Sequence, residues 1–511
     1  MATTTAVSEA ASGILQEKRK LKKSLFRWDL ALFSICALVG IDTLGQVASY
    51  GTQTLFWLVF LSVFFLIPYG LIVAELGTNL PVEGAVYEWV RLAFGHLAGS
   101  VTAVVYWIAN PVWLGGTLAV TAIAAMDTLW GTQIGGNTAL AIIVGLVFVW
   151  VGIAMNILSL RHMKWVPSLG TVVRVVLLLL FGLLVLGAVV GGKNQGSINA
   201  GDLAPTAAVF VGVLGTLIFN YVGFELQSNA SEEMGDPKRD VPRSVAVTWV
   251  AGLIFYLIPI GGILLVASSK NISNVKGFVT GYQTVVTSLF GSGAASALNY
   301  LVGAMVVFSL LAGGVVWLMG SDRAMAISSL AGSGPRPLGF FSKRFGTPVP
   351  VNVLSGIMAS IFLILSFVIT SGNLASFFGT VLAVVISTTT FSYVAVFPAI
   401  LVLRRRYAAN GRGYMIPGGA VVLWIAALLA EFFVIAATIF TLWPGICSSN
   451  GCFSSDATAA ISNVARGTWE LWTIGTMAFV VLIGVAFWLV GRSHQVSEQY
   501  ELVSASGEPV L

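Results

Sequence analysis

The sequence predicts an all-α protein that crosses a membrane twelve times. Of its 511 residues 57% are hydrophobic and only 9% are charged, and a mean hydropathy of +0.92 excludes a soluble globular protein. The apolar runs are continuous rather than alternating, which favours helices over a β-barrel. A helix needs roughly 20 apolar residues to cross about 30 Å of hydrocarbon. Such stretches lie near residues 29–50, 54–78, 98–127, 138–157, 167–190, 206–229, 244–268, 297–320, 349–370, 374–402, 420–442 and 468–491.

The basic residues orient these spans. With both termini in the cytoplasm, 21 of the 26 Lys and Arg residues fall on the cytoplasmic side, four fall outside, and Arg174 lies within a span. The positive-inside rule therefore predicts a multi-pass protein of the cell membrane with cytoplasmic termini. This topology explains the net charge of +5, which gives no support for nucleic-acid binding.

Two of the spans, the first and the sixth, are interrupted by glycine beside a carboxylate. The first contains Gly40, Ile41 and Asp42, and the sixth contains Gly223 and Glu225. A charge in hydrocarbon is costly and marks a functional site, and glycine-broken helices free backbone groups that hold a solute. Two interrupted spans separated by four intact ones suggest two five-helix halves of opposite orientation. We interpret this pattern as a membrane transporter with a site for a cation.

Cysteine and histidine positions bear on redox chemistry and on metals. Cys447 and Cys452 fall on a loop that the topology places outside, where they either form a local disulfide or remain free thiols. The three histidines show no metal-ligand spacing, so no metal or cofactor is expected. No paired catalytic acids stand out, which argues against a membrane-embedded transferase and leaves it as an alternative.

Several motifs resemble those of the amino acid, polyamine and organocation transporter superfamily. The stretch from Phe219 to Val245, FNYVGFELQSNASEEMGDPKRDVPRSV, carries an aromatic-Gly-x-Glu break followed by an acidic pair and a Pro-Arg tail. Further similar motifs are IPYGLIVAELGTNLP, GAVYEWVRLAFG, GSDR at 320–323, GTPVP at 346–350 and YMIPGG at 414–419. The resemblance covers about residues 25–490. Within the superfamily, the sequence is most similar to the glutamate/GABA antiporter and polyamine:proton symporter branches.

This resemblance implies a leucine-transporter-like fold, a 5+5 inverted repeat with broken helices 1 and 6 and a substrate held between them. It also implies secondary active transport of amino acids, related amines or polyamines by alternating access, as an antiporter or a proton-coupled symporter, and no enzymatic activity. A non-transporting solute sensor is a second alternative. The oligomeric state is not predicted. The chain then divides into a basic cytoplasmic tail (1–27), a ten-helix transport core (28–403), helices 11 and 12 (404–494) and a cytoplasmic C-terminal tail (495–511).

Three charged residues are candidates for binding or coupling. Asp42 is expected to bind a substrate ammonium or to couple transport; otherwise it is a neutral acid or pairs with an internal base. Glu225 matches an acid shared by relatives with different substrates, which favours gating or proton sensing. Arg174 matches a lysine that many relatives carry in place of a sodium ion, and as an arginine it stands in for a cation without shuttling protons. The alternative for Arg174 is that it extends toward the cytoplasmic surface.

Aromatic and amide residues complete the candidate site. Phe219 matches an aromatic gate over the substrate in relatives, although a packing role also fits a chain with 31 phenylalanines. The alternative for Asn110 and Asn220 is a role in helix packing, because an Asn in a membrane helix often bonds across helices. The predicted substrate-binding residues are Gly40, Ile41, Asp42, Asn110, Phe219, Asn220, Gly223 and Trp317, with Trp107 and Trp113 as further candidate walls.

Overall fold

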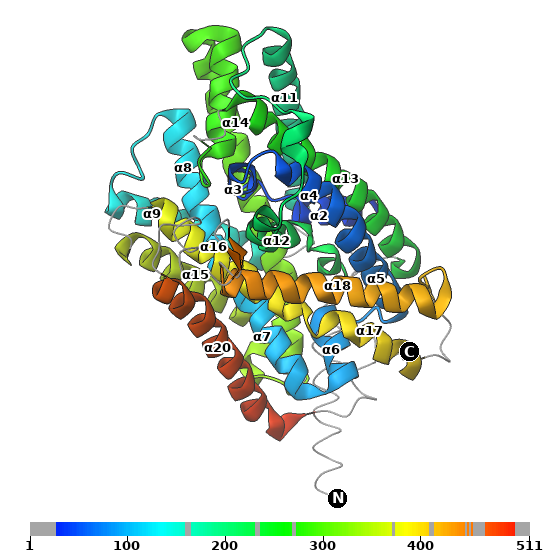
Figure 1. Cartoon of the computed structure of the whole chain (residues 1–511). Coiled ribbons are helices and arrows are strands. Elements are labelled where there is room, and N and C mark those ends of the chain that lie inside the picture. The colour runs from blue at the N-terminus through cyan, green and yellow to red at the C-terminus, as the bar shows by residue number, and fades with distance from the viewer. Residues whose placement is uncertain are drawn as a thin grey trace, which may run out of the picture.

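A computed structural model describes most of the chain (Figure 1). The described residues are 27–158, 165–229, 236–267, 272–369, 374–407, 413–444, 447–448, 451–452 and 466–495. The predicted tails, 1–27 and 495–511, lie almost wholly outside the described residues.

The described elements are helices apart from one short hairpin (Figure 1). The first half contains α2 (Arg27–Leu38), α3 (Leu44–Ser49), α4 (Gln53–Leu61), η1 (Ser62–Leu66), α5 (Ile67–Asn79), α6 (Ala85–Phe94), α7 (His96–Trp113), η2 (Leu114–Leu118), α8 (Ala119–Trp130), α9 (Thr138–Ile157), α11 (Trp165–Val190), η3 (Ala200–Leu203), α12 (Ala207–Tyr221) and η4 (Phe224–Leu226). The second half contains α13 (Pro237–Val266), α14 (Gly277–Leu330), η7 (Arg336–Gly339), α15 (Val349–Ile369), α16 (Leu374–Tyr393), α17 (Val396–Arg406), α18 (Gly419–Leu442), β1 (Cys447–Ser448), β2 (Gly451–Cys452), α20 (Arg466–Gly491) and η8 (Arg492–His494).

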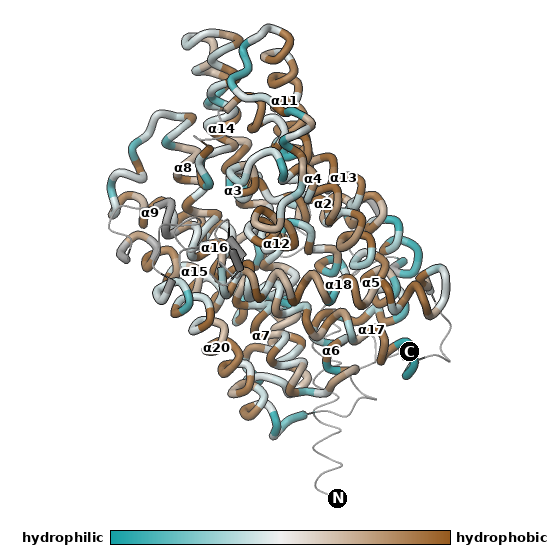
Figure 2. Tube along the Cα trace, viewed as in Figure 1, coloured by the Kyte–Doolittle hydropathy of each residue, from teal (hydrophilic) through white to brown (hydrophobic). Residues whose placement is uncertain are grey.

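The helices have the length and composition of a multi-pass membrane protein. Among the described residues ten helices are long and apolar enough to cross a membrane. Two shorter apolar helices, Asp29–Leu38 and Val349–Leu365, lie in two further stretches that the sequence predicted as spans. Apolar residues run along the helices, and hydrophilic residues gather in several connecting segments (Figure 2).

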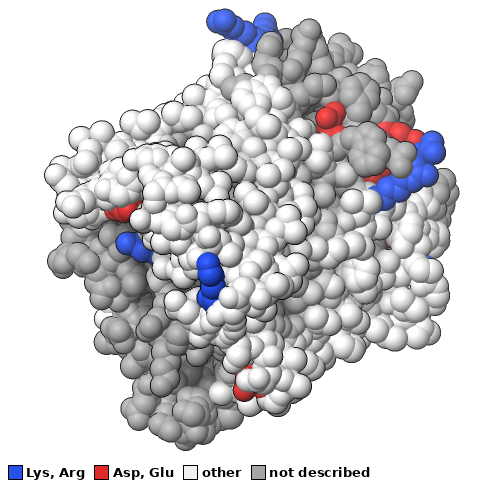
Figure 3. Space-filling model, turned by 90° about the horizontal axis from the view of Figure 1, so that it is seen from above, with Lys and Arg blue, Asp and Glu red and all other residues white. Residues whose placement is uncertain are grey.

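The outer surface is largely apolar. Leu183, Leu428 and Leu471 are 68%, 60% and 72% exposed, and each lies on a helix long enough to span a bilayer. Viewed from above, charged side chains are few and scattered over an otherwise uncharged surface (Figure 3). Apolar surface of this extent requires lipid rather than water as its solvent.

The eighth predicted span is part of a much longer helix. Its apolar stretch covers 297–320, whereas α14 runs over 54 residues and contains one non-helical residue, Gly291, with φ of +73°. Hydropathy detects the part of a helix that lipid surrounds, and a helix of this length exceeds the roughly 30 Å of hydrocarbon. The bend at Gly291 therefore divides α14 into a short first segment and a long second one.

The backbone is interrupted at both predicted positions. Helix α2 ends at Leu38 and α3 begins at Leu44, so five residues between them leave the helix. Helix α12 ends at Tyr221, and Gly223 follows with φ of +130°, a conformation that side-chain-bearing residues rarely adopt. Both interruptions are internal, because Asp42 and Thr43 in the first and Val222 and Glu225 beside the second are at most 1% exposed.

Cys447 and Cys452, for which a disulfide and two free thiols were both open, belong to a hairpin of two short strands. Strands β1 and β2 pair antiparallel, with Cys447 opposite Cys452 in the backbone register. The side chains of both cysteines lie outside the described residues, so the disulfide stays a prediction.

Candidate functional site

Arg174 binds the end of the first half-helix. The last carbonyl groups of a helix have no partner within it. From α11, Nη1 of Arg174 donates to the Cys36 carbonyl at 2.5 Å, while Nη2 and Nε donate to the carbonyl and hydroxyl of Ser309 in α14 at 2.5 and 2.7 Å. Arg174 is only 2% exposed and points into the bundle rather than along the lipid surface. Its guanidinium is therefore a fixed positive charge between α2 and α14.

The next two carbonyl groups of α2 are also occupied. Nε1 of Trp317 in α14 donates to the Ala37 carbonyl at 2.9 Å, and the Tyr256 hydroxyl of α13 donates to the Leu38 carbonyl at 2.6 Å. The same hydroxyl accepts from the backbone N–H of Gly40 at 2.9 Å. Three successive carbonyls thus bind donors from three helices, which holds the first interruption in one conformation.

Asp42 lies inside this interruption and is incompletely paired. It is 1% exposed, and its Oδ2 accepts from the indole N–H of Trp113 at 2.8 Å. Its Oδ1 has no hydrogen-bond partner among the described residues. A Cβ added at Gly40 would lie 3.2 Å from Oδ1, so glycine keeps space open beside this oxygen. The site thus contains a buried carboxylate oxygen that is free to accept.

A direct hydrogen bond joins the two interruptions. The hydroxyl of Thr43, next to Asp42, donates to Oδ1 of Asn220 at 2.8 Å. The Nδ2 of Asn220 is buried without a partner in the described part of the chain. Buried polar atoms in proteins nearly always have a hydrogen-bond partner. The unpaired Oδ1 of Asp42 and the unpaired Nδ2 of Asn220, both buried at these interruptions, therefore call for an explanation.

Three aromatic rings surround this region. The ring of Trp113 packs edge-on against Phe219, with centroids 6.0 Å apart, and against Trp317 at 6.2 Å. A Cβ added at Gly223 would lie 3.3 Å from the Trp317 ring, which places the second interruption beside the same indole. The three rings therefore form an aromatic wall beside Asp42 and the second interruption.

The second carboxylate, Glu225, is fully paired. It is completely buried in η4 and accepts hydrogen bonds from three tyrosine hydroxyls that belong to three helices. Oε2 accepts from Tyr69 of α5, and Oε1 accepts from Tyr106 of α7 at 2.8 Å and Tyr393 of α16 at 2.6 Å. Both carboxylate oxygens are therefore occupied by the protein itself.

Tyr69 also holds the backbone of the second interruption. Its hydroxyl oxygen accepts from the N–H groups of Gly223 and Phe224, both at 2.9 Å. These are the amides that the break releases from helical pairing. Tyr69 therefore ties both the backbone and the carboxylate of this interruption to α5.

The remaining candidates differ in their surroundings. Ile41 is 4% exposed within the first interruption. Nδ2 of Asn110 donates to the Tyr106 carbonyl one turn earlier at 2.9 Å, on the α7 face that also carries Trp113. Trp107 instead donates its indole N–H to Ser355 of α15 at 2.8 Å. Its hydrogen bond therefore goes to α15, whereas that of Trp113 goes to Asp42.

A third buried carboxylate lies outside this site. Asp322 of α14 accepts from Ser355 at 2.7 Å and from Asn156 of α9 at 3.0 Å. Its neighbour Arg323 pairs with Glu83 at 3.2 Å. These contacts link α14 to α9, α15 and the segment before α6, which is a packing role.

Sequence reasoning missed Thr43 and the tyrosines. Isolated tyrosines in apolar spans look like ordinary membrane aromatics, so their hydroxyl contacts were invisible. Two signals were nevertheless present: Thr43 directly follows Asp42, and Tyr69 lies in the IPYG motif. The overlooked tyrosines are Tyr69, Tyr106, Tyr256 and Tyr393.

Comparison with known proteins identifies relatives over most of the chain. Residues 25–445 match the sequence model described as amino acid permease. The chain is 28% identical to the probable agmatine/putrescine antiporter AguD of Lactococcus lactis subsp. lactis (strain IL1403), over 84% of this chain and 89% of the relative. It is 25% identical to a glutamate/gamma-aminobutyrate antiporter of the same strain, over 81% and 84%. It is 27% identical to the lysine-specific permease LysP of Escherichia coli (strain K12), over 61% and 63%.

Proposed function

The chain belongs to the amino acid permease family, and from this premise we propose that it transports a small cationic amine. Its family and its similar proteins indicate that it is a secondary transporter of amino acids or polyamines and not an enzyme. The observation that carries the proposal is the buried Oδ1 of Asp42, which has no partner among the described residues. A buried charge with an unused oxygen is costly, and a cationic ligand would compensate it.

The backbone amides at both interruptions support an amine over a substrate held by its α-carboxylate. A carboxylate would require free N–H groups at the break. The amide of Gly40 donates to Tyr256, and those of Gly223 and Phe224 donate to Tyr69. These three donors are therefore not available to a substrate carboxylate, and the vacant acceptor at Asp42 favours positive charge beside it.

The relatives suggest which class of amine the site would bind. The probable antiporter AguD is named for agmatine and putrescine, which carry cationic groups at both ends of a short aliphatic chain. In our proposal one cationic end binds Oδ1 of Asp42, and the rings of Trp113, Phe219 and Trp317 enclose the adjoining methylenes. The free Nδ2 of Asn220 would orient a water molecule or a neutral acceptor beside it.

The proposed transport cycle uses twelve spans, of which residues 28–403 form a ten-helix inverted repeat that alternates access around Asp42. Both termini would lie in the cytoplasm, with the protein in the cell membrane. Arg174 would serve as the permanent cation between α2 and α14, because it already binds Cys36 and Ser309. No coupling ion is then needed at that point.

Glu225 would act as the gate. Opening the second interruption requires η4 to separate from tyrosines on three helices. In our proposal a coupled proton or an exchanged solute loosens the gate by weakening these three hydrogen bonds, as symport or antiport requires.

Counterflow in proteoliposomes tests this function. Liposomes loaded with unlabelled putrescine or agmatine should accelerate uptake of the labelled amine, because only a carrier exchanges solutes across the membrane. If only zwitterionic amino acids accelerate uptake, the proposal of a cationic amine substrate is refuted, whereas the transport activity of the family is confirmed. No acceleration by any amine or amino acid would favour a non-transporting sensor.

An Asp42→Asn variant tests the site itself. We expect affinity for the amine to fall by at least about 30-fold, because one partner of a buried charge pair is removed. Asp202→Asn is the matched control, since Asp202 lies in an exposed segment and contacts Asn199. Both variants should elute as folded protein, and unchanged affinity in Asp42→Asn would remove Asp42 from the site.

A further inference from the structure

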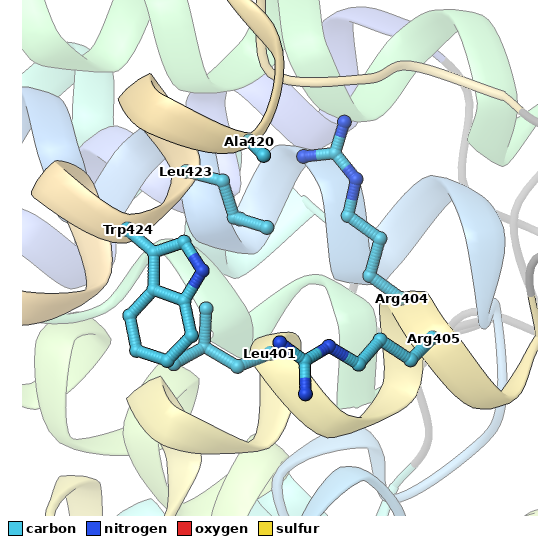
Figure 4. Close-up of a pocket in the computed structure, with 6 residues that line it drawn as sticks. All are labelled: Leu401, Arg404, Arg405, Ala420, Leu423 and Trp424. Carbon is cyan, nitrogen blue, oxygen red and sulfur yellow. The ribbon is translucent and has the colours of Figure 1, made fainter.

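A small pocket lies between α17 and α18, away from the interruptions (Figure 4). Its volume is about 220 Å³, below the roughly 300–1,000 Å³ of sites for drug-sized ligands. Both arginine side chains leave α17 and reach toward α18, where Leu423 and Trp424 face them (Figure 4). The lining residues are Leu401, Arg404 and Arg405 of α17 and Ala420, Leu423 and Trp424 of α18.

The pocket carries an excess of positive charge. Nε of Arg404 lies 3.4 Å from Oε1 of Glu75, whose other oxygen accepts from the backbone N–H of Ile416 at 2.7 Å. The Nη1 of Arg404 is buried without a hydrogen-bond partner in the described chain. Arg405 adds a second guanidinium to the lining. Glu75 pairs with Arg404 and with a backbone amide, and Arg405 adds a further positive charge to the lining, so an anion would find excess positive charge here.

An apolar stripe on α18 begins at this pocket. Val421, Ile425, Leu428 and Phe432 are 69%, 52%, 60% and 60% exposed, and their spacing places them on one face of the helix. Trp424 belongs to the stripe, at 42% exposed, and also lines the pocket. A ligand seated at the arginines can therefore continue along the lipid-facing side of α18.

We propose that this pocket binds the phosphate of an anionic phospholipid, with an acyl chain lying along the stripe of α18. Arginine pairs with phosphate through parallel N–H donors, and basic pockets between membrane helices are suited to lipid head groups. Tryptophan at a membrane interface places its ring at head-group depth. A free phosphate would use the arginines but gain nothing from the apolar stripe, which is why a lipid fits this surface better.

The test uses the full-length protein, purified in detergent and stripped of lipid, with phosphatidylglycerol and phosphatidylcholine as probes. We expect phosphatidylglycerol to raise the apparent melting temperature and to remain bound in native mass spectra, because a ligand of the folded state stabilises it by mass action. Phosphatidylcholine should do neither at the same concentration. An equal response to both lipids would overturn the proposal.

Variants assign the effect to the pocket. Arg405→Gln should weaken phosphatidylglycerol binding by about fivefold, in keeping with one basic residue at a membrane surface. Arg405 is preferred to Arg404 because it leaves the contact with Glu75 intact. Lys343→Gln, an equal charge change at another exposed position, is the control and should bind like the wild type. Equal affinities of the two variants would overturn the assignment.

A soluble anion is the remaining source to separate. Glycerol phosphate and inorganic phosphate, added at the same concentration as the lipid, should leave the melting temperature unchanged. If either reproduces the shift caused by phosphatidylglycerol, the pocket is an anion site and the lipid proposal fails.

Discussion

The two helix interruptions contain the same ingredients and use them differently. Each has a glycine, a buried carboxylate and a tyrosine that binds the freed backbone. Glu225 accepts from three tyrosine hydroxyls, whereas Asp42 accepts from one indole and keeps an oxygen unpaired among the described residues. The carboxylate that the protein satisfies is suited to hold helices together. The one that it leaves unsatisfied is suited to bind something else.

The difference also explains why charge in a membrane is not by itself a binding signal. Asp322 and Glu225 are as buried as Asp42, yet hydrogen bonds from the chain occupy both oxygens of each. A structural carboxylate is distinguished from a ligand-binding one by whether hydrogen-bond donors of the protein occupy both of its oxygens.

Removing each carboxylate in turn is the strongest test of the difference between Glu225 and Asp42. Glu225→Ala leaves three buried hydroxyls without their acceptor, so the free energy of unfolding should fall by about 3–5 kcal/mol. Asp42→Ala should lower it by about 1 kcal/mol or less, because it removes a poorly paired charge and one hydrogen bond. Denaturant unfolding of the purified variants measures both changes. Equal losses would show that the two carboxylates have the same role.

A second comparison removes one donor from each carboxylate. Tyr69→Phe loses the bond to Glu225 and two bonds from backbone amides, so we expect a loss of about 2–3 kcal/mol in stability. Trp113→Phe loses one bond to Asp42 and some packing against Phe219 and Trp317, and should lower stability by about 1–2 kcal/mol. The same unfolding assay applies. A larger loss for Trp113→Phe would contradict the assignment of Glu225 as the structural carboxylate.

The coupling between the two regions is expected to be small. Thr43 donates to Asn220 across the interruptions, so a double-mutant cycle of Thr43→Val and Asn220→Ala should give an interaction energy of about 1 kcal/mol. Combining Thr43→Val with Asp202→Asn, in an exposed segment, should be additive within about 0.5 kcal/mol. Additivity in both cycles would mean that the interruptions are energetically independent.

Much of the architecture could be predicted without a structure because hydropathy is a local property. A window of about 20 residues is enough to detect a helix in lipid. The predicted ends differ at α14, where the predicted span covers 297–320 and the helical segment runs from Gly277 to Leu330 with a bend at Gly291. A hydropathy window detects the apolar part of a helix and not the turns that continue beyond it.

The sequence by itself determined where the first and sixth spans are broken and that Asp42 and Glu225 lie at these breaks, because glycine and a charge inside an apolar run are visible in a few residues. Only the tertiary structure decided what each carboxylate meets. The donors to Glu225 come from Tyr69, Tyr106 and Tyr393, which are 156, 119 and 168 residues away. Hydrogen bonding depends on angles and distances between packed helices, and no local pattern in the chain encodes those relations.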